Sequence, residues 1–233
     1  MTTGQFPLSP DLIAQASDIL SEVVEKTPVM LSERLGDLIG VPVYLKREDM
    51  QKCRSFKVRG AYFRMSTLSE EERRRGVVCA SAGNHAQGLA YACAQLKVRG
   101  TIYLPSNTPK QKRQRIETIG GDWVEQVIVD GTFDRANAQA QEAARHSGRT
   151  YVHPYDDPCT IAGQGTIAVE LEEQVLSEAA AVLVPVGGGG LLSGIATWIR
   201  SRFPDIKIYG VEPRGAASMA AAMEADQIVS LPS

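Results

Sequence analysis

Short runs of apolar residues alternate along the chain with longer segments in which apolar residues recur every three or four positions. The short runs have the length of buried strands, and they fall at 43–45, 77–80, 101–104, 124–129, 181–186 and 206–211. The segments between them carry the apolar stripes of amphipathic helices. We therefore predict an α/β protein with mostly parallel sheets that helices cover on both faces.

Capping residues mark several of the helix boundaries. Ser9-Pro10-Asp11 offers an N-cap, a proline at the first helical position and an acid at the positive end of the helix dipole. Thr108-Pro109 predicts the start of another helix and Gly120 its end. Further helices are expected at 58–65, 86–94, 134–147, 159–176 and 191–199. A proline-rich segment at 151–158 could carry the chain from one sheet to another.

Charge and hydropathy exclude several classes of protein. The chain of 233 residues has 27 acidic and 25 basic side chains, so it lacks the basic excess of a nucleic-acid binder. Its longest apolar run, at 179–186, is far below the ~20 residues that cross a bilayer. The first 20 residues lack the basic start and the unbroken apolar run that are typical of a secretory signal. We predict a cytoplasmic protein with neither a membrane nor a nucleic acid as partner.

The cysteines give no sign of a disulfide framework or a zinc site. Cys53, Cys79, Cys93 and Cys159 stand far apart, and none of them forms a CxxC pair. This usage fits reduced thiols in a cytosolic protein. We expect each of them to be a small buried residue.

Four consecutive glycines, Gly187 to Gly190, join a predicted strand to a predicted helix. Without a Cβ the backbone can approach an anion closely and turn several N–H groups toward one phosphate. A flexible turn is the alternative. The segment lacks the third glycine of a GxGxxG fingerprint, and Ile195 stands where a nucleotide P-loop needs a lysine. We favour a phosphate site that serves neither NAD nor ATP.

A second loop, Ser81-Ala82-Gly83-Asn84-His85, also leaves a strand and enters a helix. Its N–H groups could bind a carboxylate, and the Asn84 amide could hydrogen-bond a ring or carbonyl oxygen. Alternatively, Ser81 or Asn84 merely caps the helix and His85 is a structural hydrogen-bonding residue. This loop alone leaves both interpretations open.

Lys57 stands at a third loop-to-helix junction. If Ser55 is the N-cap, Lys57 lies in the first turn, where the helix dipole disfavours its positive charge. A lysine must lose its proton to act as a nucleophile or a base, so this position suits catalysis. A lysine able to form a Schiff base, a glycine loop for a phosphate and an asparagine-bearing anion loop together describe a site for pyridoxal 5'-phosphate.

Six segments complete the pattern: Tyr44-Leu-Lys-Arg-Glu-Asp49, Arg54-Ser-Phe-Lys-Val-Arg-Gly-Ala-Tyr62, Ala80-Ser-Ala-Gly-Asn-His-Ala-Gln-Gly88, Pro154-Tyr-Asp-Asp-Pro158, Ile161-Ala-Gly-Gln-Gly-Thr166 and Val186-Gly-Gly-Gly-Gly-Leu-Leu-Ser-Gly194. In order and spacing they resemble the threonine dehydratases, or threonine ammonia-lyases. These belong to the pyridoxal-phosphate enzymes that include the tryptophan synthase β chain.

The resemblance implies two doubly wound α/β domains with the cofactor between them, known as pyridoxal-phosphate fold type II. It places a small domain at 51–150 and a large domain at 1–50 and 151–233. Family members continue with a serine or cysteine that hydrogen-bonds the pyridine nitrogen, and biosynthetic members add a regulatory module. We therefore expect a partial chain whose large domain is incomplete at its C-terminus.

The resemblance also implies a role for each motif residue. Lys57 would bind the cofactor aldehyde and move the α-proton of the substrate, and Phe56 would lie beside the cofactor ring. Asn84 would hydrogen-bond the ring hydroxyl oxygen. The substrate carboxylate would be bound at Ser81, Gly83, Asn84 and His85. The phosphate would be held by Gly187, Gly188, Gly189, Gly190 and Leu191.

The implied reaction converts the amino acid L-threonine to 2-oxobutanoate and ammonia, in isoleucine biosynthesis or threonine catabolism. A homodimer or homotetramer is expected. Serine racemases and serine dehydratases share these loops and remain alternatives, whereas β-replacing sulfhydrylases differ around Lys57 and Asn84. A catalytically silent fragment of the same fold is a third possibility.

Neither Glu212 nor the basic run at 110–115 is predicted to bind a ligand. Glu212 matches a divalent-cation ligand of some relatives, but alanines and a serine follow it at 216–218, so no metal is predicted. The basic run at 110–115 is expected to be a solvated helix face, since the net charge of the chain is only -2.

Overall fold

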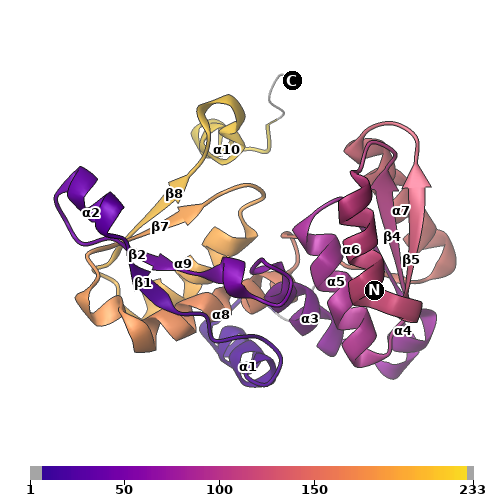
Figure 1. Cartoon of the computed structure of the whole chain (residues 1–233), viewed down its shortest axis with the longest axis horizontal. Helices are drawn as coiled ribbons and strands as arrows, with labels where there is room; N and C mark the ends of the chain where they lie inside the picture. The colour runs from indigo at the N-terminus through magenta and orange to yellow at the C-terminus, as the bar shows by residue number, and fades with distance from the viewer. Residues whose placement is uncertain (1–6, 230–233) are drawn as a thin grey trace.

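The computed structural model describes residues 7–229, in which helices and strands alternate along most of the chain (Figure 1). The helices are α1 (Pro10–Leu20), α2 (Glu33–Ile39), α3 (Lys57–Ser66), α4 (Glu70–Arg75), α5 (Asn84–Leu96), α6 (Lys110–Gly120), α7 (Phe133–Ser147), α8 (Pro158–Gln174), α9 (Gly190–Arg202) and α10 (Ser218–Ala225). The strands are β1 (Val29–Leu31), β2 (Tyr44–Lys46), β3 (Val77–Ala80), β4 (Gly100–Pro105), β5 (Val124–Val129), β6 (Thr150–Tyr151), β7 (Ala181–Pro185) and β8 (Lys207–Val211). Short 3-10 helices lie at Glu48–Met50, Gly121–Trp123, Leu176–Glu178 and Arg214–Ala216.

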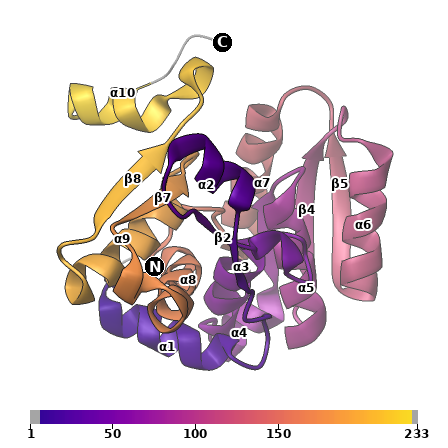
Figure 2. The same ribbon diagram turned by 60° about the vertical axis from the view of Figure 1, so that its left-hand side comes forward.

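The middle of the chain forms a parallel sheet with the strand order β5-β4-β3-β6. Successive side chains of a strand point to opposite faces, and β3 shows this alternation directly. Val77 and Cys79 are buried with side chains of α5 and α6, whereas Val78 and Ala80 are buried with side chains of α7. Helices therefore cover both faces of this sheet, as predicted (Figures 1 and 2).

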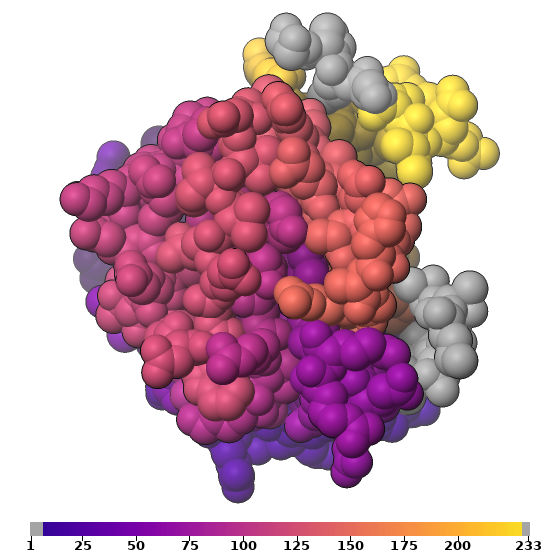
Figure 3. Space-filling model, turned by 90° about the vertical axis from the view of Figure 1, so that its right-hand side faces the viewer, coloured from indigo at the N-terminus to yellow at the C-terminus, as the bar shows by residue number. Residues whose placement is uncertain are grey.

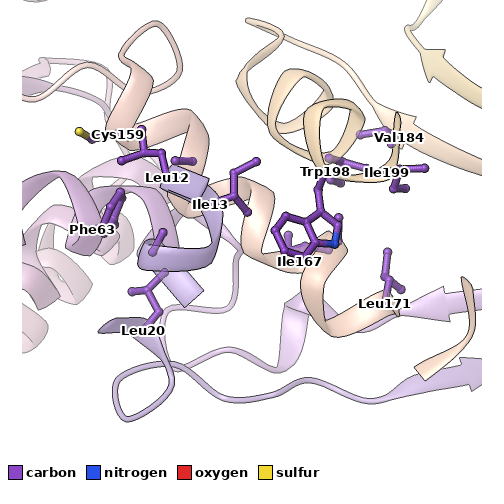
Figure 4. Packing of buried hydrophobic residues seen from close by; sticks show 14 of the residues in the cluster. Leu12, Ile13, Leu20, Phe63, Cys159, Ile167, Leu171, Val184, Trp198 and Ile199 are labelled. Atoms are coloured by element: carbon purple, nitrogen blue, oxygen red, sulfur yellow. The ribbon is translucent and has the colours of Figure 1, made fainter. Parts of the chain in front are cut away.

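A second buried cluster gathers α1, α8, α9 and β7 around side chains far apart in the sequence (Figure 4). The buried stripe of α1 includes Leu12 and Ile13, and its N-terminus is closed by Ser9, whose hydroxyl accepts a hydrogen bond from the Leu12 N–H at 3.2 Å. Ile167 and Trp198 bring α8 and α9 into the same cluster. Full burial of one such side chain is worth about 1.5–3 kcal/mol, so this packing holds α1 against α8 and α9.

Helix α3 lies between the two clusters. Its Phe63 is buried in the cluster of α1, α8 and α9, while its Met65 is buried against the central sheet. Tyr62 contacts both clusters. Since α3 begins at Lys57, the N-terminus of this helix lies where the two halves of the structure meet.

Two small sheets complete the described residues. Strands β1 and β2 pair antiparallel, and β7 and β8 pair parallel. The expectation that helices cover both faces does not hold for the second pair, because Leu183 is 67% exposed and Tyr209 and Val211 are each 50% exposed within the described chain. The β1–β2 pair is antiparallel and all other pairs in the described residues are parallel, so the sheets are mostly parallel, as predicted.

The sequence pattern misses β1, α2, α4, β6 and α10, each of which has at most eight residues. Strand β6 spans only Thr150–Tyr151, and α4 is wholly charged, so neither offers an apolar period to detect. Helix α4 is stabilised by a capping box in which Ser69 and Glu72 hydrogen-bond each other's backbone N–H groups. Among residues 7–229 no helix is both long and apolar enough to span a bilayer.

Candidate functional site

Lys57 is the first residue of α3, and its side chain points to the mid-chain segment that precedes α8. Its Nζ donates a hydrogen bond to the Pro154 carbonyl oxygen at 2.7 Å and lies 5.3 Å from the Phe56 ring centre and 6.0 Å from that of Tyr155. Burial lowers the pKa of the Lys57 amine from its ordinary value of 10.5 to about 8. The neutral, nucleophilic amine is therefore far more populated near pH 7 than in an exposed lysine.

The cap of α3 differs from the predicted one. The residue before the helix is Phe56, which is half-buried, and not Ser55. The Ser55 hydroxyl accepts a hydrogen bond from the Lys57 N–H at 3.3 Å, so it binds the first helical N–H rather than one deeper in the first turn. The predicted consequence still holds, because Lys57 does lie in the first turn.

The glycine loop leads into α9, which begins at Gly190 after Gly189 in the left-handed conformation at φ +83. A Cβ on Gly188 would lie 2.3 Å from the Tyr155 ring, and one on Gly190 would lie 2.6 Å from the Tyr155 carbonyl oxygen. Within the described residues no side chain caps this helix. Its first N–H groups and positive dipole end are thus available to an anion, with half-buried Leu191 one residue further along the helix.

The loop before α5 contradicts the Ser81 or Asn84 cap that one of its sequence interpretations proposed. The N-cap residue is Gly83, and no side chain of residues 7–229 caps the helix, so the interpretation of Ser81 or Asn84 as a simple cap is wrong. The Ser81 hydroxyl accepts a hydrogen bond from the Gly83 N–H at 3.2 Å. Asn84 is exposed at the first helical position. The N-terminus of α5 is therefore a second place where backbone donors are available to an anion.

His85 is buried, and one of its two ring nitrogens makes a structural hydrogen bond. Its Nε2 is hydrogen-bonded to the Val152 carbonyl oxygen at 2.9 Å, while its Nδ1 is buried without a partner among the described residues. Burial lowers the pKa of His85 to about 3, with the hydrogen bond to Val152 opposing the shift. The ring is therefore neutral at pH 7.

The segment 152–155 joins the three predicted loops, a role that the sequence did not reveal. Val152 binds His85, Pro154 accepts the hydrogen bond from Lys57, and Tyr155 contacts the glycine loop. Figure 3 shows this orange mid-chain segment against purple and magenta parts of the chain. The only sequence signal was its place in a motif, to which no residue role was attached.

Glycines at the helix crossings let these loops approach one another. A Cβ on Gly88 of α5 would lie 3.0 Å from the backbone of Lys57, and one on Gly60 of α3 would lie 2.5 Å from the Thr160 carbonyl oxygen in α8. The backbones of α5 and α8 therefore pass directly beside α3 near its first turn. This close packing fixes the direction in which the Lys57 side chain leaves its helix.

A buried cluster of charges, Arg59, Glu48, Glu170 and Lys46, anchors the same helix on its other side. Arg59 is only 1% exposed, and it hydrogen-bonds Glu48 at 2.8 and 2.9 Å and Glu170 at 2.6 Å. Lys46 also pairs with Glu170, and it donates to the Thr27 carbonyl oxygen at 2.7 Å. The cluster thus ties the 25–48 segment and α8 to α3, two residues from Lys57.

Glu212 has a structural partner. Its carboxylate accepts hydrogen bonds from the Met219 and Ala220 N–H groups, each at 2.9 Å, so it closes the N-terminus of α10. Within residues 7–229 no group of three His, Cys, Asp or Glu side chains could hold a metal ion. All four cysteines are buried and free, as expected from the sequence.

The residues present fit pyridoxal 5'-phosphate at three points. Lys57 offers an amine with a lowered pKa for the aldehyde. The α9 N-terminus, with glycines where any Cβ at Gly188 or Gly190 would clash, offers donors for the phosphate. The α5 N-terminus and Asn84 offer polar groups for ring or substrate oxygens. Tyr155, between Lys57 and the glycine loop, links the first two points.

The chain resembles known sequences along nearly its whole length. Residues 20–233 match the family described as pyridoxal-phosphate dependent enzyme. The L-threonine dehydratase biosynthetic IlvA of Mycobacterium tuberculosis (strain ATCC 25618 / H37Rv) is 50% identical over 226 residues, which are 97% of this chain and 53% of that protein. The protein of the same name from Bacillus subtilis (strain 168) is 44% identical over 94% of this chain and 52% of its own. The chain spans about half the length of the curated relatives it matches.

Solved structures share the fold. Maize serine racemase superposes with a TM-score of 0.91 at 33% identity, covering 98% of this chain and 68% of that one. The processed form of threonine deaminase isoform 2 from Solanum lycopersicum superposes with a TM-score of 0.87 at 45% identity, covering 95% of this chain and 61% of that one.

Proposed function

The chain belongs to the pyridoxal-phosphate dependent enzymes, and we propose that it catalyses the conversion of L-threonine to 2-oxobutanoate and ammonia. The observation that carries this proposal is the half-buried Lys57, whose amine has a pKa near 8, at the meeting point of two uncapped helix N-termini and the 152–155 segment. The identity of 50% to a protein named L-threonine dehydratase supports threonine as the substrate.

The proposed cofactor contacts follow from the three loops. Lys57 would hold the aldehyde, and Phe56 would lie beside the ring. Asn84 would meet the ring hydroxyl oxygen, and the glycine loop with Leu191 would hold the phosphate. When bound, pyridoxal phosphate stabilises the negative charge that develops at the substrate Cα as its proton leaves.

The chain's own groups supply binding and proton transfer. Lys57, released from the aldehyde when substrate arrives, would take the α-proton at Nζ, and its lowered pKa suits a base working near neutral pH. The N-terminus of α5, with Ser81, Gly83, Asn84 and His85, would bind the substrate carboxylate through backbone N–H groups. Because His85 is neutral there, it would add no charge, and the dipole of α5 would contribute positive potential together with nearby Lys57 when that amine is protonated.

We also propose the domain division and the assembly expected from the sequence. A small domain at 51–150 and a large one at 1–50 and 151–233 is supported by two buried clusters on either side of α3. Size-exclusion chromatography with light scattering would test the proposed homodimer or homotetramer, which we expect to be cytoplasmic.

The reaction is tested by assaying purified protein for 2-oxobutanoate. The chain of 233 residues and the product of the reading frame followed beyond Ser233 are each incubated with pyridoxal phosphate and L-threonine. We expect 2-oxobutanoate and ammonia in equal amounts from the longer product. If neither protein releases 2-oxobutanoate, the proposal is wrong. If only the longer one does, the chain of 233 residues is a silent fragment.

Serine chemistry is the second candidate, because maize serine racemase superposes so closely. The same preparations are given L-serine, and pyruvate and D-serine are measured. We expect kcat/KM for L-threonine to exceed that for L-serine. D-serine formation that outpaces 2-oxobutanoate release would assign the chain to the racemases instead.

Gly188→Ala should weaken cofactor binding at least about tenfold. The new Cβ would lie 2.3 Å from the Tyr155 ring, so either the glycine loop or Tyr155 must shift. A tenfold rise in Kd corresponds to about 1.4 kcal/mol. Titration of the visible absorbance of the bound cofactor measures the effect. Gly215→Ala is the matched control, because no described heavy atom lies within 4 Å of its Cβ position. Equal affinity of the two variants would contradict the proposed phosphate site.

A further inference from the structure

His153 forms a compact turn in the segment that joins Lys57 to the glycine loop. Its Nδ1 accepts hydrogen bonds from the Asp156 N–H at 2.7 Å and the Tyr155 N–H at 3.3 Å. A ring nitrogen that accepts from two N–H groups carries no proton, so the imidazole is neutral with its proton on Nε2. The other end of the turn is held by the Thr160 hydroxyl, which donates to the His153 carbonyl oxygen at 3.2 Å.

The ring also packs between two tyrosines. Its centre lies 4.6 Å from that of Tyr155 and 6.0 Å from that of Tyr151, in edge-to-face arrangements. His153 therefore holds Tyr155 in two ways, by accepting its backbone N–H and by packing against its ring.

Two contacts of the proposed site depend on this turn. The Pro154 carbonyl oxygen accepts the Lys57 hydrogen bond, and Tyr155 contacts the glycines at 188 and 190. Among residues 7–229, neither a hydrogen bond nor an aromatic contact joins His153 itself to the Lys57 amine or to the glycine loop. His153 therefore acts on those groups through the backbone of the turn and through the Tyr155 ring, and its charge, when protonated, acts directly on that of Lys57.

We propose that His153 is a positioning residue whose neutral imidazole folds the 154–156 turn and so places the Pro154 carbonyl against Lys57 and Tyr155 against the glycine loop. The inference rests on the proposed function only for its link to the cofactor. The turn and its contact with Lys57 belong to the cofactor-free chain.

Protonation of His153 would undo the turn. Burial lowers the pKa of His153, while the charges of Asp156 and Asp157 raise it and that of Lys57 lowers it. Tyr151 and Tyr155 pack edge-to-face against the ring, burial raises the pKa of Tyr151 to about 12, and neighbouring His85 is neutral. Because the folded pKa lies below the unfolded value, the stabilisation is present above about pH 6.5 and is lost as pH falls through the folded pKa.

Two substitutions separate hydrogen bonding from packing. In His153→Asn, the amide oxygen can occupy the place of Nδ1 and accept the two N–H groups, but it does not titrate. In His153→Phe, the ring keeps its packing and loses the acceptor. Circular dichroism and urea unfolding of both variants check that they fold.

The first measurement uses the cofactor-free chain and needs no activity. Trace acetylation with acetic anhydride, read by peptide mass spectrometry, gives the pH midpoint of Lys57 reactivity. We expect a midpoint near 8 in wild type and His153→Asn. In His153→Phe it should move by about one pH unit toward the ordinary lysine value, because Lys57 becomes solvated. An unchanged midpoint in a folded His153→Phe overturns the proposal, and so does a midpoint in His153→Asn that moves as far as in His153→Phe.

The second measurement is the Kd of pyridoxal phosphate between pH 5 and 8. His153→Phe should raise the Kd at least about tenfold at pH 8, and wild type should lose affinity in acid more steeply than His153→Asn. Equal acid dependence of wild type and His153→Asn overturns the proposal even if His153→Phe fails to fold. If no protein binds the cofactor, the proposed function fails, while the acetylation midpoints still decide the role of His153.

Discussion

Replacement of Lys57 by alanine should reduce the rate of 2-oxobutanoate release from L-threonine by at least about 1,000-fold. Lys57 is the buried amine with the lowered pKa, and in the proposed mechanism it both holds the cofactor and takes the α-proton. The variant should also lose the visible absorbance of lysine-bound pyridoxal phosphate. Because alanine leaves the Pro154 carbonyl oxygen without its donor, a modest loss of stability is expected as well.

Lys112→Ala is the matched control for this experiment. Lys112 is an exposed lysine of α6, on a helix that covers the central sheet and contributes nothing to the proposed site. Steady-state rates and absorption spectra of both variants and wild type are recorded at pH 8. The control should match wild type in both. If Lys57→Ala keeps the visible absorbance and turns over L-threonine, another lysine holds the cofactor and the proposed site is wrong.

Local patterns in the sequence were sufficient to predict many of the helices and strands. The strands at 77–80 and 124–129 were predicted with the observed bounds. Val77–Ala80 is a short unbroken apolar run that is buried throughout, as is typical of a central parallel strand, whereas 124–129 is an edge strand whose valines and isoleucine mark it despite Glu125 and Gln126. The α1 cap was predicted because Ser9 and Pro10 have strong positional preferences. The position of Lys57 in a first turn needed only the neighbouring helix pattern.

Long-range contacts could not be obtained in this way. Pro154 contacts Lys57 although the two residues are 97 positions apart in the sequence, and Tyr155 contacts the distant glycine loop. A local apolar period cannot predict contacts between residues so far apart. The prediction that Ser55 is the N-cap of α3 was wrong, because Phe56 holds that position. The Ser55 hydroxyl lies one residue earlier and accepts a hydrogen bond from the first helical N–H, that of Lys57. Strand pairing was also beyond local patterns, since the pairing of β1 with β2 depends on where the chain turns.

Helix α3 is held in place by the ion pairs of Arg59 with Glu48 and Glu170. Removing Arg59 is therefore the substitution with the largest expected effect on stability. Arg59→Met should lower the free energy of unfolding by about 3–5 kcal/mol, the usual cost of removing one partner of a buried ion pair. The substitution keeps a long apolar side chain but leaves Glu48 and Glu170 without the guanidinium that they share. Urea unfolding, followed by circular dichroism, measures the loss as a shift in midpoint at constant slope.

The matched control is an exposed arginine in a similar pair. Arg75 bonds Glu71 one helical turn away, with side chains 41% and 70% exposed, so Arg75→Met should cost only about 0.3–0.5 kcal/mol. A second substitution then identifies the cause of the loss at Arg59. If the unpaired carboxylates are responsible, adding Glu48→Gln to Arg59→Met should recover part of the lost stability, since the amide costs less to bury than the carboxylate. No recovery would assign the loss to packing, and a loss no larger than that of Arg75→Met would show that the buried charges do not hold α3 in place.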